Sequence, residues 1–154
     1  MLYWIFDLDY TLYDINKSLN FNYERLDKDK PLDTFLKLLP CKKIIFTNGT
    51  YDHAIKCLDI MDIKNNFESI IARNTISDLK PNMNAYIKMM FMCDIDKKDK
   101  CVFFEDSINN LIIAKKFGWI TVLISKFSIN NNSIDFCFPS VHYALRYFLT
   151  KISS

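Results

Sequence analysis

Short apolar runs alternate along this chain with longer segments in which apolar residues recur at helical spacing. The short runs predict strands over Leu2–Phe6, Lys43–Phe46, Ser69–Ala72, Cys101–Phe104 and Thr121–Ile124. Runs that are short and continuously apolar are typical of strands buried on both faces of a parallel sheet. The pattern therefore predicts an α/β protein, a three-layer Rossmann-like fold with a central parallel sheet of about five strands and helices on both faces.

Helical periodicity fills the spaces between the expected strands. Apolar residues recur at intervals of three and four over residues 32–39, 54–61 and 85–92, which predicts three helices. A fourth helix is expected after Ser107 and should end at Gly118, because glycine commonly follows the last helical residue. A last helix is expected from Pro139 through Leu149. The polar stretch from Asp14 to Lys30 shows no steady period.

Composition indicates a packed protein with one core. The chain has 154 residues, of which 50% are hydrophobic and 25% charged, so it has enough apolar material for a folded interior and fits a single domain over residues 1–154. A net charge of +2 without a basic stretch makes nucleic acid an improbable partner. No segment reaches the roughly 18 apolar residues of a membrane span.

The cysteines and the amino terminus point to the cytoplasm. Five cysteines are an odd number, they form no C-x-x-C pair, and most lie within apolar runs. Such thiols behave as small hydrophobic side chains in a reducing compartment. The first residues lack the basic region and cleavage site of a secretory leader. We therefore expect a cytoplasmic protein.

Pairs of aspartates separated by one residue are common in this chain, and their context distinguishes them. They are Asp7 with Asp9, Asp27 with Asp29, and Asp94 with Asp96. Only the first pair follows a strand that is expected to be buried; the other two lie in lysine-rich stretches that resemble solvated loops. Ligands of doubly wound sheets bind outside the carboxyl ends of the strands, so the first pair is the catalytic candidate.

Three further stretches place polar residues at the ends of apolar runs. KIIFTNG provides Thr47 and Asn48, LKPN provides Lys80, and CVFFEDS provides Glu105 and Asp106. Each has an ordinary structural explanation as a helix cap, a surface lysine or a charged first helical turn. Their common position at element boundaries, in this order, indicates a single polar site at one edge of the sheet.

These stretches resemble the four motifs of the haloacid dehalogenase-like superfamily of phosphohydrolases, matched here by DLDYT, TN, K-P and ED. Within the superfamily the chain looks most like the pyrimidine 5'-nucleotidase-type members, through FDLDYTLY, TNGTYDHAIKCL and EDSINNL. The resemblance covers residues 2 to about 124. It implies a Mg²⁺-dependent phosphomonoesterase that forms an aspartyl-phosphate intermediate and acts on nucleoside 5'-monophosphates or other small phosphate esters.

The resemblance assigns catalytic and metal-binding roles to four acids. Asp7 would attack phosphorus, and Asp9 would protonate the leaving oxygen and then activate water. The implied Mg²⁺ ligands are Asp7, the backbone carbonyl of Asp9, Asp106, and Glu105 either directly or through water.

Phosphate binding falls to residues of the second and third motifs. By resemblance, Lys80 supplies positive charge, the Thr47 hydroxyl binds phosphate oxygen, and Asn48 contributes its backbone N–H. Residues that we expect near the substrate or behind these groups are Thr11, Asn110, His53 and Tyr10. For His53 we favour a structural or substrate-edge role over catalysis.

The chain departs from the family pattern in three respects. Tyr10 stands where related nucleotidases often carry a small polar residue, and Glu105 replaces a commoner aspartate. Only 40 positions separate Asp7 from Thr47, which leaves residues 14–39 for a reduced cap, a loop with short helices. Aromatic side chains of this region, Tyr13, Phe21 and Tyr23, should pack together or stack on a base.

A reduced cap predicts an open site. We expect weak discrimination among small phosphorylated substrates, or a site covered by a second copy of the chain, another partner or a large substrate. Two other classes of function remain open at this point. One is a phosphotransferase or phosphomutase with the same aspartyl-phosphate chemistry, and the other is a non-catalytic binding or scaffold protein.

Overall fold

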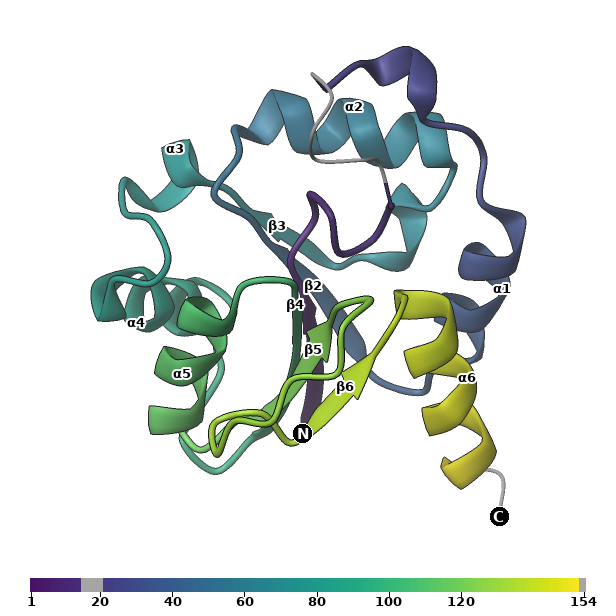
Figure 1. The fold of residues 1–154 in the computed structure, drawn as a ribbon. Helices are drawn as coiled ribbons and strands as arrows, with labels where there is room; N and C mark the ends of the chain where they lie inside the picture. Colours follow the sequence, from purple (N-terminus) through teal and green to yellow (C-terminus); the bar gives the residue numbers. More distant parts are fainter. Residues whose placement is uncertain (15–20, 153–154) are drawn as a thin grey trace.

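The computed structural model describes residues 1–14 and 21–152, and its centre is one parallel sheet (Figure 1). The sheet has six strands in the order β3-β2-β1-β4-β5-β6. The strands are β1 (Leu2–Phe6), β2 (Lys42–Phe46), β3 (Ser69–Ile71), β4 (Lys100–Glu105), β5 (Ile120–Ile124) and β6 (Phe136–Phe138). All five expected strands are present, and no end differs from the expected one by more than one residue.

The sixth strand was not expected from the sequence. β6 pairs in parallel with β5 at the edge of the sheet, with Leu123 opposite Cys137. It has only three residues, all partly exposed, and so lacks the longer apolar run that marks the interior strands.

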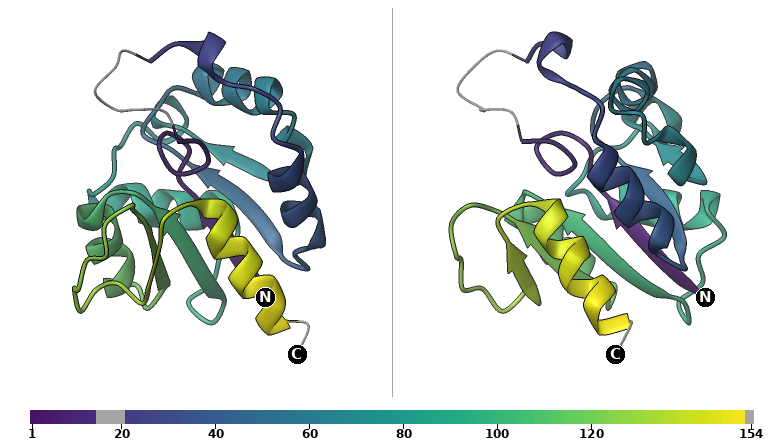
Figure 2. Two further views of the ribbon diagram at one scale, coloured as in Figure 1. Left: turned by 45° about the vertical axis from the view of Figure 1, so that its right-hand side comes forward. Right: turned by 90° about the vertical axis from the view of Figure 1, so that its right-hand side faces the viewer.

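The helices lie on both faces of the sheet, which confirms the three-layer prediction (Figures 1 and 2). They are α1 (Lys30–Leu38), α2 (Tyr51–Met61), α3 (Arg73–Ile76), α4 (Met83–Met92), α5 (Ile108–Lys116) and α6 (Val141–Ile152), with short 3₁₀ helices η1 (Tyr23–Arg25) and η2 (Lys64–Asn66). Among the described residues, no helix is both long enough and apolar enough to cross a bilayer.

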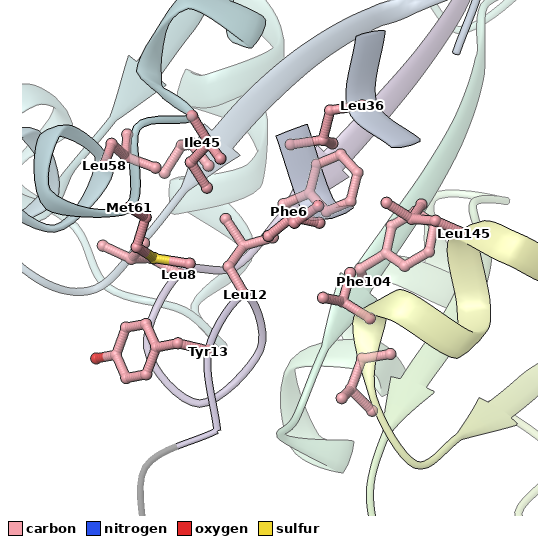
Figure 3. Packing of buried hydrophobic residues seen from close by; sticks show 14 of the residues in the cluster. Phe6, Leu8, Leu12, Tyr13, Leu36, Ile45, Leu58, Met61, Phe104 and Leu145 are labelled. Carbon is pink, nitrogen blue, oxygen red and sulfur yellow. The ribbon is translucent and has the colours of Figure 1, made fainter. Parts of the chain in front are cut away.

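Alternation along β1 divides the interior into two cores. Trp4 and Phe6 pack with buried residues of α1, α2 and α6, whereas Tyr3 and Ile5 pack with buried residues of α4 and α5. Figure 3 shows the first core, which includes Leu36 of α1 and Leu145 of α6. Within it Phe6 and Phe104 stack with ring centroids 4.6 Å apart. The sheet is therefore covered on both faces, as its continuous apolar strands require.

The predicted insertion over residues 14–39 lies partly outside the described residues, which omit 15–20. The described remainder contains η1 and α1, and Leu26, Leu32 and Leu36 join the core beneath them. Helix α5 follows Ser107 as expected, and Gly118 adopts a positive φ of 80° just beyond its end. The last helix begins at Val141, two residues after the predicted Pro139.

Strand order determines where polar residues can meet. β1 has β2 on one side and β4 on the other, and the chain reverses its direction of winding between β1 and β4. This is the switch point where doubly wound sheets bind ligands. The carboxyl ends of these three strands lead directly into Asp7, Thr47 and the Glu105–Asp106 pair.

Asp29, from one of the pairs that the sequence placed in solvated loops, is a structural cap. Its Oδ1 accepts a hydrogen bond from the Leu32 backbone N–H at 3.0 Å, and its Oδ2 lies 2.8 Å from His142 Nε2. The first contact caps α1 and the second ties it to the first turn of α6.

We expect Asp29→Ala to lower the free energy of unfolding by about 1–2 kcal/mol, because it removes a helix cap. Asp29→Asn keeps a cap acceptor and should lose less. Urea unfolding of both variants beside Asp27→Ala, which changes an exposed neighbour, measures the effect. Equal stability of Asp29→Ala and Asp27→Ala would contradict it.

Candidate active site

The ammonium group of Lys80 lies at the centre of the site. Its Nζ donates to Asp7 Oδ1 at 3.0 Å, to Glu105 Oε2 at 2.9 Å and to the Phe46 carbonyl at 2.6 Å. Burial alone would lower the pKa of Lys80, but Asp7 and Glu105 outweigh it and raise the pKa. Lys80, whose side chain is 1% exposed, is therefore a paired, buried cation and not a surface lysine.

Asp7 is held rigidly at the end of β1. Its backbone N–H donates to the Phe104 carbonyl at 2.9 Å, which extends the pairing of β1 with β4 by one residue. Its Oδ2 accepts from the Thr11 hydroxyl at 3.1 Å, and the same hydroxyl lies 3.3 Å from Asp106 Oδ1. Burial, followed by repulsion from Glu105, raises the pKa of Asp7 well above its ordinary value, although Lys80 opposes the shift.

Both carboxylate oxygens of Glu105 are occupied by donors. Oε2 accepts from Lys80 and from Asn110 Nδ2, and Oε1 accepts from the backbone N–H groups of Asp106 and Ser107. The residue is 1% exposed. Four donors fix this carboxylate in place, and they assign Asn110 the task of supporting it.

Three acids form one cluster around this centre. Asp7, Glu105 and Asp106 each offer a carboxylate oxygen within 4.8 Å of the others. Lys80 contacts Asp7 and Glu105, so within the described ranges 1–14 and 21–152 this ammonium is shared by two of the three carboxylates. An all-oxygen set with excess negative charge suits a hard divalent ion, and these residues could hold a metal ion.

Asn48 contacts the lysine loop through its side chain. Its Oδ1 accepts from the Lys80 backbone N–H at 2.8 Å, and its Nδ2 donates to the Lys80 carbonyl at 2.9 Å. The sequence-based expectation concerned only the backbone N–H of Asn48, so this clamp is an additional role. It fixes the backbone that carries the central ammonium.

Gly49 leaves open a space that sequence reasoning missed. Its N–H donates to Thr47 Oγ1 at 3.0 Å, and a hydroxyl that accepts one hydrogen bond still has its own proton to donate. A Cβ at Gly49 would lie 3.2 Å from the His53 ring, 3.3 Å from Thr47 Oγ1 and 3.5 Å from Asp9 Oδ2. A side chain at this position would therefore crowd His53 and Thr47, which would have to shift by a few tenths of an ångström.

Asp9 has a set of partners distinct from the acid cluster. Its Oδ1 accepts from the Tyr13 hydroxyl and lies 2.7 Å from His53 Nε2, while the Tyr23 hydroxyl lies 2.7 Å from His53 Nδ1. Burial and the hydrogen bond to Asp9 raise the pKa of Tyr13, so the phenol remains a donor. Sequence reasoning gave Tyr13 and Tyr23 only packing or stacking roles, and their contacts with this network depend on the path of the insertion.

Tyr10, one of the departures from the family pattern, has φ 63°, in the left-handed region. This conformation costs a residue with a side chain about 1–2 kcal/mol, and asparagine enters it far more readily than tyrosine does.

A cavity of about 690 Å³ opens beside the acid cluster. Asp106 and Thr11 contribute to its wall, together with Tyr10, Tyr13 and Phe127. It is within the range of small-molecule sites, and its lining mixes apolar and aromatic side chains with polar and charged ones, including Asp14 and Lys126.

The cysteines are free thiols, and two of them, Cys57 and Cys101, are buried as expected from the sequence, whereas Cys41, Cys93 and Cys137 are partly exposed. Burial raises the pKa of Cys57 and of Cys101 to about 12. These two thiols remain protonated at neutral pH and are therefore poor nucleophiles.

Comparison with known proteins identifies the family. The family model described as haloacid dehalogenase-like hydrolase matches residues 32–124. The matched span includes Thr47, Lys80, Glu105 and Asp106, and it begins after Asp7 and Asp9.

Solved structures share the fold at low sequence identity. A putative beta-phosphoglucomutase from Thermotoga maritima has a TM-score of 0.74 at 12% identity, over 96% of this chain and 98% of that chain. A HAD phosphatase from Thermococcus onnurineus has a TM-score of 0.63 at 21% identity, over 79% and 57% of the two chains. An L-2-haloacid dehalogenase from Xanthobacter autotrophicus has 0.64 at 17% identity, over 82% and 62%. The chain thus spans about 60% of the length of the last two.

We expect Asp7→Asn to raise the thermal unfolding midpoint of the metal-free protein, because it removes a charge that its surroundings disfavour. The raised pKa of Asp7 means that its protonated form favours folding below an ordinary aspartate pKa of about 4. That contribution is lost as pH rises through the higher folded-state value. The gain in the variant should therefore be small in acid and larger at mildly alkaline pH.

Thermal unfolding with a chelator at both pH values measures this difference. Asp59→Asn, at an exposed position on α2, is the control and should show no such trend. A midpoint of Asp7→Asn below that of the wild type at alkaline pH would contradict the expectation.

Proposed function

We propose that this chain, which belongs to the haloacid dehalogenase-like hydrolase family, is a Mg²⁺-dependent phosphomonoesterase with Asp7 as its nucleophile. One observation carries the proposal: Asp7 stands at the end of β1 in contact with a buried ammonium, next to two further carboxylates. Phosphoryl transfer needs an aligned nucleophile and positive charge for the phosphate oxygens. This arrangement can meet both needs.

Residues of the chain divide the reaction between them. An oxygen of Asp7 attacks phosphorus, the bond from phosphorus to the leaving oxygen breaks, and its electron pair accepts a proton from Asp9. Asp9 then takes a proton from water as that water attacks phosphorus of the aspartyl-phosphate, which restores Asp7 and releases phosphate. Lys80 supplies positive charge near the phosphate oxygens while its three N–H donors keep their protein partners, and the Thr47 hydroxyl donates to a phosphate oxygen; both groups are fixed before reaction.

The metal site is proposed to use Asp7, Asp106 and the backbone carbonyl of Asp9. When bound, Mg²⁺ supplies positive charge against the phosphate oxygens and offsets the repulsion between the carboxylates. The four donors on Glu105 favour a contact through water for this residue. Its main task is then to hold Lys80.

The proposed substrates are small phosphate esters, with nucleoside 5'-monophosphates among them. The cavity beside Asp106 has room for the remainder of such an ester, and Phe127 at its wall is 77% exposed. The short insertion offers few contacts to a base, so we expect weak discrimination, or cover from a second copy of the chain, another partner or a large substrate.

A phosphotransferase or phosphomutase is the second candidate. The likeness to the putative beta-phosphoglucomutase, which extends over 96% of this chain, favours it. The two candidates share the aspartyl-phosphate and differ in whether water or a second substrate receives the phosphoryl group.

We expect release of inorganic phosphate from nucleoside 5'-monophosphates and sugar phosphates in the presence of Mg²⁺, and its loss on chelation and in Asp7→Asn. A panel of these esters with phosphate detection measures activity and preference. Asp59→Asn is the control for a carboxylate lost elsewhere.

Phosphate that appears on an added sugar phosphate instead of in solution would favour the second candidate. Halide release from an L-2-haloacid without phosphate release would refute both. No turnover by the wild type under any of these conditions would leave the binding or scaffold function.

We expect Gly49→Ala to lower kcat/KM by about 10- to 100-fold, because its methyl group intrudes between Thr47 and Asp9 and displaces the phosphate. Any loss of stability should come from crowding by the added methyl group and not from backbone strain, because Gly49 does not have a positive φ. Gly118→Ala is the matched control: Gly118 has φ 80° with no atom within 4 Å of an added Cβ, so it should lose stability and keep activity. Retention of full activity by Gly49→Ala would contradict the proposed phosphate position.

A further inference from the structure

The network around Asp9 joins three parts of the chain that are distant in sequence. Asp9 and Tyr13 belong to the loop after β1, His53 lies in the first turn of α2, and Tyr23 begins η1. The hydrogen bonds run from Tyr23 to His53 and from His53 to Asp9. The insertion therefore reaches the proposed acid through one imidazole.

The direction of these hydrogen bonds follows from the chemistry of the acceptor. A carboxylate oxygen can only accept, so Nε2 of His53 carries the proton that points at Asp9 Oδ1. In the neutral imidazole the other nitrogen is then an acceptor for the Tyr23 hydroxyl. The Tyr13 hydroxyl is a second donor to Oδ1. One oxygen of Asp9 thus receives two donors.

The other oxygen of Asp9 faces the proposed phosphate position. Asp9 Oδ2 lies beside the space at Gly49, the space that Thr47 Oγ1 also borders. When Asp9 is protonated, an oxygen that already accepts from two donors is a poor place for the acidic hydrogen. The hydrogen then belongs on Oδ2.

We propose that His53 is a positioning residue that, with Tyr13 and Tyr23, places the proton of Asp9 on the oxygen that faces the leaving group. This inference rests on the proposed function. As the bond from phosphorus to the leaving oxygen breaks, the electron pair of that bond takes the proton from Oδ2. Asp9 becomes a carboxylate whose Oδ1 keeps both donors, so no hydrogen bond has to reorganise.

The surroundings of His53 support a fixed orientation. Its ring packs edge-on against Phe21 with centroids 5.1 Å apart and lies 5.5 Å from the Tyr23 ring. Lys56, on the next turn of α2, places its Nζ 4.1 Å from the Tyr23 ring centroid. The short insertion therefore orients a group of the proposed chemistry, beyond any part it has in covering the site.

A metal site is the competing explanation for these residues. Asp9, His53 and Cys57 each offer one ligand atom within 4.8 Å of the others. However, Asp9 Oδ1 and His53 Nε2 are 2.7 Å apart, a hydrogen-bond distance. Two ligands with bonds of about 2 Å to a tetrahedral zinc would lie roughly 3.3 Å apart. The observed spacing favours the hydrogen bond.

Dependence on the leaving group tests the inference. An acid is needed most when the leaving oxygen is strongly basic, as in an alkyl phosphate, and least for 4-nitrophenyl phosphate. The value of kcat/KM covers steps through departure of the leaving group, so it isolates the first transfer. We expect His53→Leu to lower kcat/KM for an alkyl phosphate by about 10-fold or more. This loss is part of the rate enhancement of ~10²–10⁴ that general acid–base catalysis typically contributes. The loss for 4-nitrophenyl phosphate should be much smaller.

Conservative and control variants separate positioning from folding. His53→Gln retains an N–H donor near the position of Nε2 and should recover part of the alkyl phosphate activity. Tyr23→Phe should show a weaker form of the same preference for the better leaving group. Tyr86→Phe removes another phenol hydrogen bond, 2.6 Å to the Asn110 carbonyl, and should lower stability without changing the ratio between the two substrates.

An equal loss on both esters in a folded His53→Leu protein would overturn the inference while leaving the phosphatase proposal intact. Zn²⁺ binding by the wild type that Cys57→Ser abolishes would overturn it in favour of a metal site. Absence of phosphate release by the wild type would overturn both proposals together. A selective loss on the alkyl phosphate, with partial recovery in His53→Gln, would support it.

Discussion

The buried ammonium of Lys80 is the interaction on which the rest of the site depends. It contacts the residue after β1, the last residue of β4 and the final carbonyl of β2, so one charge joins three neighbouring strand ends. A buried charge of this kind destabilises a fold by several kcal/mol if it loses its partners. Asp7 and Glu105 depend on Lys80 equally, because without it their negative charges would repel each other where water does not screen them. The position of each group is therefore determined by the others.

Uncharged side chains hold the charged groups in place through hydrogen bonds. Asn48 clamps the backbone of Lys80, Asn110 supports Glu105, and the Thr11 hydroxyl lies between Asp7 and Asp106. Each of them restricts the orientation of a charged group through hydrogen bonds. The molecule maintains this order at some expense in stability, since Asp7 is disfavoured in its charged form and Tyr10 has a positive φ. Sites that hold reactive groups in place commonly carry such strain.

Sequence reasoning located the charged centre because most of its residues obey a rule that is visible along the chain. The acids and Thr47 follow or end apolar runs, and parallel strands bring the ends of such runs to one edge. Lys80 instead lies between α3 and α4, and the resemblance to the family motifs indicated it. The same reasoning could not find β6, which is three residues long and partly exposed. It also could not give Tyr13 and Tyr23 their hydrogen-bonding partners, because an insertion without periodicity does not reveal its path. Gly49 was within a quoted motif, but its need for space depends on His53, a contact made only in the folded chain.

The two aspartates of the first motif, Asp7 and Asp9, are close in sequence but have different hydrogen-bonding partners. Asp7 lies at the carboxyl end of β1 among charged groups, where a cation is needed to balance the negative charge of the carboxylates. Asp9 accepts hydrogen bonds from Tyr13 of the loop after β1 and from His53 of α2, and Tyr23 of the insertion reaches it only through His53. In the proposed mechanism Asp7 is the nucleophile and Asp9 the acid, so the first must be charged when it attacks and the second must hold a proton. Lys80 favours the charged form of Asp7 against burial and the repulsion of Glu105, and the donors on Asp9 Oδ1 leave Oδ2 for the proton. The proposed roles therefore follow the two sets of partners, and they give the insertion a part in the chemistry through Tyr23 and His53.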